Sequence, residues 1–131
     1  MAVLEFAAAR LGKRVAAPGG LGGECVDLVE LWATSLGAAP IAGNAADLLA
    51  NADTGQWTAV SNGPANSPPA GAIVVWHEAP AVGIGRYGHT AICLAADGWW
   101  LLTLDQNWPA GAPVRVQLHS YAGVAGWLVR K

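Results

Sequence analysis

The amino-acid sequence predicts an α+β domain in which N-terminal helices pack on one face of a five- to six-stranded antiparallel sheet. Apolar residues recur at helical spacing over roughly the first 50 positions, and β-branched or apolar runs separated by turn residues follow from residue 56 onward. The chain has 131 residues, of which 53% are hydrophobic, which is enough to fill one core. We therefore expect a single domain over residues 1–131.

Three helices are expected in the first part of the chain. Apolar residues at helical spacing over residues 3–11 predict the first helix, which Gly12 ends. A longer apolar face over residues 25–36 predicts the second helix, and Gly37 is typical of the position after a helix C-terminus. A third, short helix is expected from Asn44, which forms a capping pair with the acidic residue three positions later.

Six short segments of strand character follow. They cover residues 56–60, 72–76, 89–96, 99–104, 114–118 and 124–129. Asp97 and Gly98 separate two of these segments, and an Asp-Gly pair between apolar runs is a strong signal for a hairpin. Because the strands follow the helices rather than alternate with them, the sheet is expected to be antiparallel.

Composition and charge argue against two classes of partner. The net charge is -2 and only 12% of the residues are charged, so no basic stripe for nucleic acid is expected. No stretch of about 18 apolar residues is present, so we expect no membrane insertion. Charged residues at positions 5, 10, 13 and 14 interrupt any apolar core of a secretory signal. We expect synthesis in the cytoplasm without a signal peptide.

Cys25 is a candidate nucleophile because of its position. It follows a glycine-rich loop over residues 18–23 and lies in the first turn of the second predicted helix. The partial positive charge of a helix N-terminus stabilises a thiolate and lowers the pKa of the thiol. The free N–H groups of such a turn can also receive an oxyanion. A buried structural cysteine is the alternative interpretation.

His89 is the best placed of the three histidines to act as the base of such a nucleophile. It follows Gly88, which allows close backbone approach, and it begins a predicted strand that would fix the position of its ring. His77 and His119 lie in loop-like contexts, and we expect both to be solvated surface residues.

The base needs a polar group that orients its ring, and Asp105 and Asn107 are the candidates. They alternate onto one face at the far end of the strand that pairs with the strand of His89. A regular two-residue turn would place Gln106 opposite His89 and both candidates on the other face. One bulge or a longer loop would bring Asp105 or Asn107 to the side of His89. We therefore predict an irregular hairpin.

The second cysteine and metal chemistry fit the pattern less well. Cys93 lies four residues from His89 along a strand, which is about 13 Å and beyond hydrogen-bond reach, so it is expected to be a core residue. No CxxC or HExxH spacing is present. We expect no metal site and no cofactor.

Five segments of the sequence together resemble one known family. They are Gly23 to Val29 (GECVDLV), Gly43 to Asp47 (GNAAD), Ala72 to Trp76 (AIVVW), Tyr87 to Ile92 (YGHTAI) and Asp105 to Trp108 (DQNW). In this order they resemble the CHAP family, the cysteine, histidine-dependent amidohydrolases/peptidases. The resemblance implies a papain-like fold and hydrolysis of peptidoglycan amide bonds, as in phage endolysins. It also implies Cys25 as nucleophile, His89 as base, and Asp105 and Asn107 as polar supports.

Two positions depart from the family pattern. The family often has Glu where this chain has Asp105, and Gln where it has Glu24. The shorter Asp105 leaves part of the orienting role open to Asn107, and Glu24 removes a side-chain donor to an oxyanion. Some members bind calcium through acidic residues ahead of the cysteine. Residues 18–23 contain no carboxylate, so no such site is expected here.

The resemblance sets further expectations about partners. Peptidoglycan is the expected substrate, reached after release from the cytoplasm, and we expect a monomer with no separate cell-wall-binding domain. Muramoyl-alanine amidase and endopeptidase activities both fit, and a catalytically silent wall-binding or tail-associated module is the alternative.

Trp76 and Trp108 are predicted to line a substrate groove near the strand ends. Trp57 is a further candidate for this groove, and core packing is expected for Trp32, Trp99 or Trp100, and Trp127.

Overall fold

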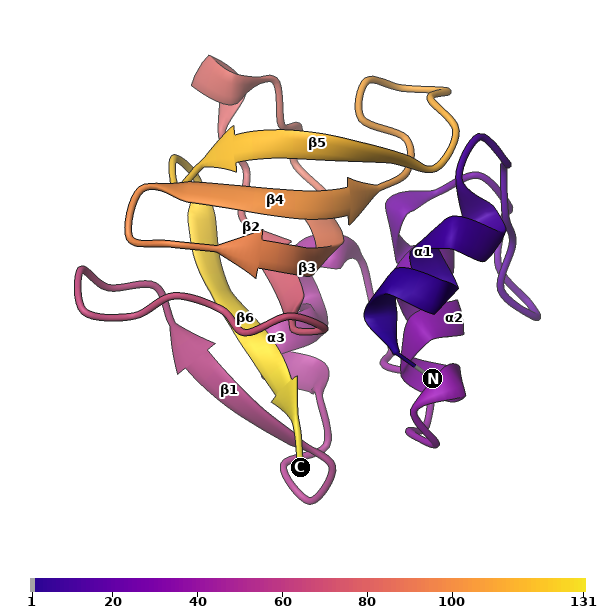
Figure 1. Cartoon of the computed structure of the whole chain (residues 1–131), viewed down its shortest axis with the longest axis horizontal. Coiled ribbons are helices and arrows are strands. Elements are labelled where there is room, and N and C mark those ends of the chain that lie inside the picture. Colours follow the sequence, from indigo (N-terminus) through magenta and orange to yellow (C-terminus); the bar gives the residue numbers. More distant parts are fainter. Residues whose placement is uncertain (1) are drawn as a thin grey trace.

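The computed structural model describes residues 2–131 and confirms the predicted α+β class. The helices are α1 (Val3–Arg10), α2 (Cys25–Ser35) and α3 (Leu48–Asn51), with short 3-10 turns η1 (Ala45–Asp47) and η2 (Pro80–Val82). The strands are β1 (Trp57–Ser61), β2 (Ile73–Trp76), β3 (His89–Ala96), β4 (Trp100–Asp105), β5 (Arg115–Ser120) and β6 (Val124–Arg130) (Figure 1). Within residues 2–131, no helix is both long and apolar enough to cross a bilayer.

The six strands form one antiparallel sheet in the order β1-β6-β2-β3-β4-β5. Strands β3, β4 and β5 run nearly side by side, whereas β6 and β1 cross them steeply, so the sheet is strongly twisted (Figure 1). Helices α1 and α2 lie beside one end of the β3–β5 portion. This arrangement brings the start of α2 near the start of β3 and the end of β4.

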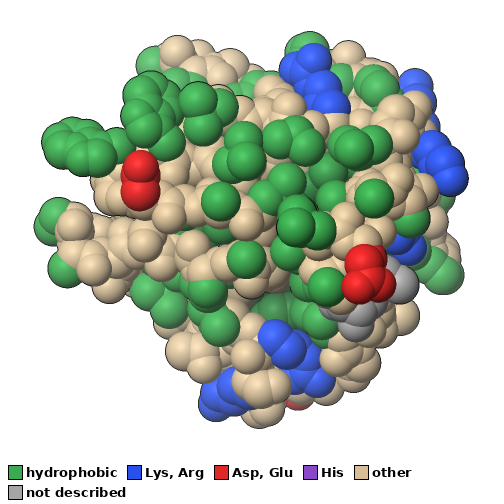
Figure 2. Space-filling view, viewed as in Figure 1, with side chains coloured by type: hydrophobic (Ala, Val, Ile, Leu, Met, Phe, Trp, Pro, Cys, Tyr) green, Lys and Arg blue, Asp and Glu red, His purple; other side chains and the backbone are tan. Residues whose placement is uncertain are grey.

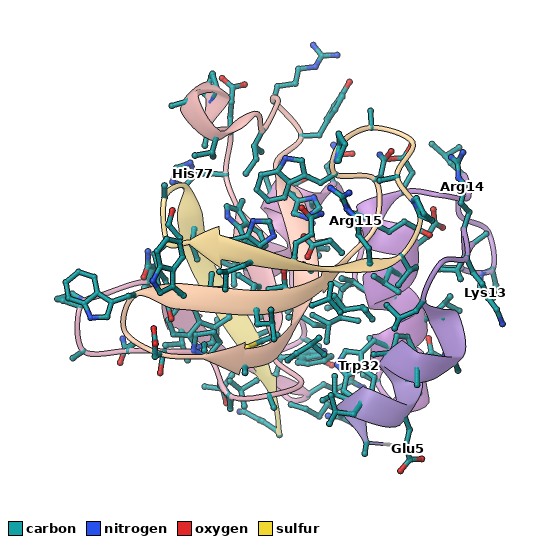
Figure 3. The ribbon with its side chains drawn as sticks, turned by 45° about the horizontal axis from the view of Figure 1, so that its top comes forward. Glu5, Lys13, Arg14, Trp32, His77 and Arg115 are labelled. Atoms are coloured by element: carbon teal, nitrogen blue, oxygen red, sulfur yellow. The ribbon has the colours of Figure 1, made fainter. Side chains whose placement is uncertain are left out.

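Each face of the sheet has its own core. On the helix side, α1 and α2 contribute Phe6, Leu28 and Trp32, which pack on Ile73 and Ile92 of the sheet. Trp32 lies between the helices and the sheet (Figure 3), and its indole N–H donates to the carbonyl of Gly71 at 2.8 Å. This bond satisfies the polar atom of a large buried ring, as burial requires.

The opposite face is covered by side chains of the sheet together with side chains of the connecting loops. Trp76 and Trp127 are its largest buried residues, and Cys93 packs with them as the predicted core cysteine. His89 belongs to this face because it pairs directly with Trp76 across β2 and β3. The base of the candidate site is therefore built on the face that turns away from the core of α1 and α2.

The β3–β4 hairpin is irregular, as predicted. Its tip lies one residue later than a turn centred on Asp97 and Gly98, because the N–H of Asp97 bonds the carbonyl of Trp100 at 3.1 Å. A bulge at Leu94 then shifts the register between Cys93 and Ala95. The two irregularities together shift the strand pairing by one residue relative to the regular hairpin. Asp105 therefore shares the face of His89.

The exposure of two tryptophans corrects a sequence expectation. Trp99 is 80% exposed and Trp100 is 51% exposed, so neither packs in the core. Trp100 lies on the helix-side face of β4, beyond the cover of α1 and α2, next to exposed Leu102 and Leu118. Apolar side chains spread over this part of the surface in Figure 2. Side chains do alternate between the two faces of the sheet along β4, but neither α1 nor α2 covers this end of the helix-side face (Figure 1).

Candidate active site

A cleft of about 620 Å³ lies where the N-terminus of α2 faces the start of β3. Cys25, His89 and Asn107 all line it, although they come from three distant parts of the sequence. Glu24 and Tyr87 contribute to the same walls. The structure thus brings three of the four predicted catalytic residues to one cavity, and the fourth, Asp105, lies buried directly behind His89.

Cys25 is the first residue of α2 because a network around Asp27 ends the preceding loop there. The Asp27 carboxylate accepts the backbone N–H groups of Ala17, Gly22 and Glu24 at 3.0–3.1 Å. Glu24 and Asp27 together form a capping box. The glycine-rich loop is therefore wound around one buried carboxylate, which fixes the residue that follows it.

The electrostatics of the thiol differ from the sequence expectation. Burial raises the pKa of Cys25 to about 11, against an ordinary value of 9.0, and the charge of Glu24 acts in the same direction. Backbone N–H groups of Thr90, Val26 and Cys25 itself lower the pKa but do not outweigh burial. The expected depression of the thiol pKa is therefore wrong. The N–H groups do lie beside the sulfur.

This pKa predicts slow alkylation of Cys25. In a Cys93→Ala variant, where Cys25 is the only thiol, the rate of reaction with iodoacetamide is expected to rise with pH up to about 11. The rate at pH 7 is expected to fall well below that of a free cysteine, because less thiolate is present. Mass spectrometry of the labelled protein measures the rate. A rate that is already maximal near neutral pH would instead indicate a resting thiolate–imidazolium pair.

His89 is held by Asp105. The two side chains meet at 2.8 Å between His89 Nε2 and Asp105 Oδ2, and both are buried. The hydroxyl of Thr103 donates to the other carboxylate oxygen. This contact occupies Nε2 and leaves Nδ1 as the ring nitrogen that can accept a proton from a thiol. Gly88 allows the approach: its φ is +73°, and an added Cβ would lie 2.3 Å from the carbonyl oxygen of Trp76.

Asn107 contacts the nucleophile side of the cleft rather than the base. Its Nδ2 donates to Glu24 Oε2 at 3.1 Å, and its Oδ1 accepts the N–H of Gly111 at 2.7 Å. The two candidate supports therefore have different partners: Asp105 holds His89, and Asn107 holds the residue that precedes Cys25. The shorter side chain of Asp105 does reach the histidine.

Gln106 is a site residue that the sequence reasoning missed. It is fully buried, and its Nε2 donates to the carbonyls of Glu24 at 2.7 Å and Val15 at 3.1 Å. Its Oε1 accepts the N–H of Val15 at 2.8 Å. The one amide therefore ties the end of β4 to the loop that leads to Cys25. Its position between two predicted site residues was the only local signal.

Replacing Gln106 with leucine is expected to lower the free energy of unfolding by about 2–4 kcal/mol, because leucine removes the acceptor of the Val15 N–H and two bonds to the carbonyls of Val15 and Glu24. Chemical denaturation measures the change. The matched control is Gln56→Leu, which removes a single exposed bond from the N–H of Ala39 and should cost less than about 1 kcal/mol. Equal losses for the two variants would contradict a special role for Gln106.

The structure does not place the predicted groove tryptophans on the cleft wall. Trp76 is fully buried because β2 is a central strand with both faces covered, so it offers no face to a substrate. Trp108 is partly buried and packs edge-on against His89, with ring centroids 4.6 Å apart. Both rings surround the base instead of lining the cleft. His77 is exposed, as expected, whereas His119 is largely buried and contacts Asp105, so its prediction as a surface residue is wrong.

Comparison with known proteins finds one matching family model and several similar endolysins. The CHAP domain family model matches residues 16–107. Endolysin PlyTW of Staphylococcus phage Twort is 29% identical over 118 residues, which cover 82% of this chain and 25% of PlyTW. The crystal structure of endolysin LysIME-EF1 superposes with a TM-score of 0.82 at 25% identity, covering 97% of this chain and 62% of that one. Ly7917 superposes with a TM-score of 0.74 at 22% identity, covering 98% and 60%.

Proposed function

This chain belongs to the CHAP domain family, and we propose that it is a cysteine hydrolase that cleaves amide bonds of bacterial peptidoglycan. The observation that carries the proposal is that Cys25 and the buried His89–Asp105 pair come together at one cleft. The similarity to the phage endolysin PlyTW and to the endolysin LysIME-EF1 supports the cell wall as the substrate. The chain spans a quarter of the length of PlyTW and about three fifths of the LysIME-EF1 chain.

The proposed reaction begins with attack of the thiol on the amide, which gives a tetrahedral intermediate. Cys25 Sγ attacks the carbonyl carbon of the amide while His89 Nδ1 takes the thiol proton. Because burial holds the pKa of the thiol at about 11, proton transfer accompanies the attack rather than precedes it. Asp105 accepts from Nε2 and stabilises the imidazolium that forms.

The following steps release the two products, first the amine and then the carboxylate. The N–H groups at the start of α2 lie beside the sulfur and can donate to the oxyanion of the tetrahedral intermediate. His89 returns the proton to the leaving nitrogen, the C–N bond breaks, and an amine departs. Water, deprotonated by His89, then attacks the thioester carbonyl and frees the carboxylate product and the Cys25 thiol.

Glu24 stands directly before Cys25 and affects how an oxyanion can be stabilised in this cleft. A carboxylate beside Cys25 cannot donate to an oxyanion when ionised, and its charge opposes the thiolate. Asn107 Nδ2 donates to this carboxylate and so partly offsets its charge. We propose that the backbone N–H groups, rather than a side chain at position 24, stabilise the oxyanion.

The experiment is a chemical analysis of digested sacculi. Purified protein is incubated with peptidoglycan from several species, and free amino groups and reducing sugar ends are both measured. The proposal expects new amino groups without new reducing ends. Mass spectrometry of the soluble fragments then separates an amidase, which releases intact stem peptides from muramic acid, from an endopeptidase, which cuts within the stem or cross-bridge.

Two other outcomes would contradict the proposal. New reducing ends without new amino groups would indicate glycosidic cleavage. Co-sedimentation with sacculi without any soluble product would indicate a catalytically silent wall-binding module.

Light scattering during gel filtration tests the expected monomer, and the same digestion without added metal or cofactor tests whether the chain alone suffices.

A further inference from the structure

We propose that His119 is a positioning residue for the catalytic base, because its imidazole holds the Asp105 carboxylate that in turn holds His89. The inference rests on the proposed function, since it concerns the reaction of the same site. His119 lies on β5 and is not among the residues that line the cleft. It therefore acts through Asp105 rather than on the substrate.

The geometry makes Asp105 the centre of three donors. His119 Nε2 lies 3.1 Å from Asp105 Oδ2, the same oxygen that His89 Nε2 contacts at 2.8 Å. Thr103 donates its hydroxyl to Oδ1. The side chain of Asp105 is fully buried, and that of His119 is 9% exposed. Removing His119 therefore takes away one of the few groups that replace water around a buried charge.

Ring packing also fixes the position of His119. Trp108 stacks on His119 with centroids 4.4 Å apart and planes 7° from parallel, and its edge meets His89 at 4.6 Å. Trp76 packs against His89 at 5.2 Å and against His119 at 5.3 Å. The two tryptophans thus hold both imidazoles against one carboxylate.

The charge balance around Asp105 supports the same role. Burial acts to raise the pKa of Asp105, but the hydrogen bonds from His119 and His89 outweigh it and keep the pKa below its ordinary value. Arg115 is paired with Asp105 across β4 and β5, yet its guanidinium bonds the carbonyl of Trp108 at 3.1 Å and Gln117 at 3.3 Å. From the α2 side, Glu24 and Cys25 face the cleft in front of His89.

Two variants of His119 separate its hydrogen bond from its packing. His119→Phe keeps a ring for Trp108 to stack on but cannot donate to Asp105. His119→Gln keeps an N–H donor at a similar reach and removes the ring. The control is His77→Phe, which changes an exposed histidine that is labelled in Figure 3. Its Nδ1 contacts the carbonyl of the adjacent Glu78.

With solubilised peptidoglycan as the substrate, His119→Phe is expected to lower kcat about tenfold and to leave KM within about twofold. Its activity should also be lost at a higher pH on the acid side, because Asp105 protonates more readily with one donor fewer. His119→Gln is expected to recover kcat to within about threefold of the wild type. A His119→Phe variant that folds and keeps the wild-type kcat and pH profile would overturn the proposal.

Histidine side-chain NMR of the wild-type protein tests the inference without any activity. Nitrogen-15 labelling should show His119 and His89 both protonated at Nε2, with resonances that shift together in an Asp105→Asn variant while His77 stays unchanged. If the His119 resonances instead stay unchanged in the Asp105→Asn variant, the proposal fails. This result would hold whether or not the protein cleaves peptidoglycan, so the two proposals fail separately.

Discussion

Replacing Cys25 with alanine is expected to lower the rate of amino-group release from peptidoglycan by about 10,000-fold or more. No thioester can form without the sulfur, and the contributions of His89 and the N–H groups have no nucleophile to act on. The helix should remain intact, because Asp27 and its backbone contacts organise the turn. Initial rates on sacculi measure the activity, and thermal unfolding checks that the variant is folded.

The chain offers a matched control at its only other cysteine. Cys93 is fully buried, so Cys93→Ala is expected to cost about 1–2 kcal/mol of stability through a small cavity and to keep most of the activity. The nucleophile assignment would be wrong if Cys25→Ala still cleaved at the wild-type rate. It would be equally wrong if a folded Cys93→Ala variant were the inactive one.

Replacing Asp105 with asparagine is expected to lower kcat by about 1,000-fold while the cleft keeps its shape. The amide oxygen can still accept from His89, and its nitrogen can face the hydroxyl of Thr103, so the fold tolerates the change. The charge that stabilises the imidazolium is lost. Steady-state kinetics measure the loss, with Asp53→Asn, an exposed aspartate, as the control.

Asp105 also predicts a pH dependence of stability. Its pKa is lowered in the folded protein, so its charge stabilises the fold at neutral pH, and this contribution is lost as the pH falls through the folded-state pKa. The difference in Tm between the wild type and Asp105→Asn is therefore expected to be largest near pH 7 and to shrink toward pH 3. A difference that stays constant over this range would mean that the charge does not stabilise the fold.

Local patterns were sufficient to predict the positions of Cys25 and His89. A glycine-rich loop before an apolar helical face marks where α2 begins, and a glycine before an apolar run marks where β3 begins. The role of Asp105 required one further step, because a regular hairpin would have placed Asp105 on the face opposite to His89. The bulge at Leu94 shifts the register by one residue and brings both side chains to the same face. These features depend on neighbours within a few residues or on one turn.

The residues that escaped prediction depend on distant contacts. His119 contacts Asp105 because β5 pairs with β4 and the sheet is twisted. The residues next to His119 in the sequence do not indicate this pairing. Gln106 bonds Val15, which is 91 residues away. The pKa of Cys25 follows from tertiary burial, whereas a helix N-terminus predicts only the smaller opposing effect of nearby N–H groups. The spacing of residues in the sequence predicts helices, strands and turns, but it does not predict which distant residues cover a given face of the sheet.

The two irregularities of the β3–β4 hairpin have different consequences for protein engineering. The tip at Gly98 and Trp99 projects away from the cleft, and an added Cβ at Gly98 meets nothing within 4 Å. A purification tag or a targeting module could be spliced there without disturbing the chemistry. Deleting Leu94 would instead turn Asp105 to the opposite side of its strand, away from His89. A library builder could therefore vary the tip freely but should leave the bulge untouched.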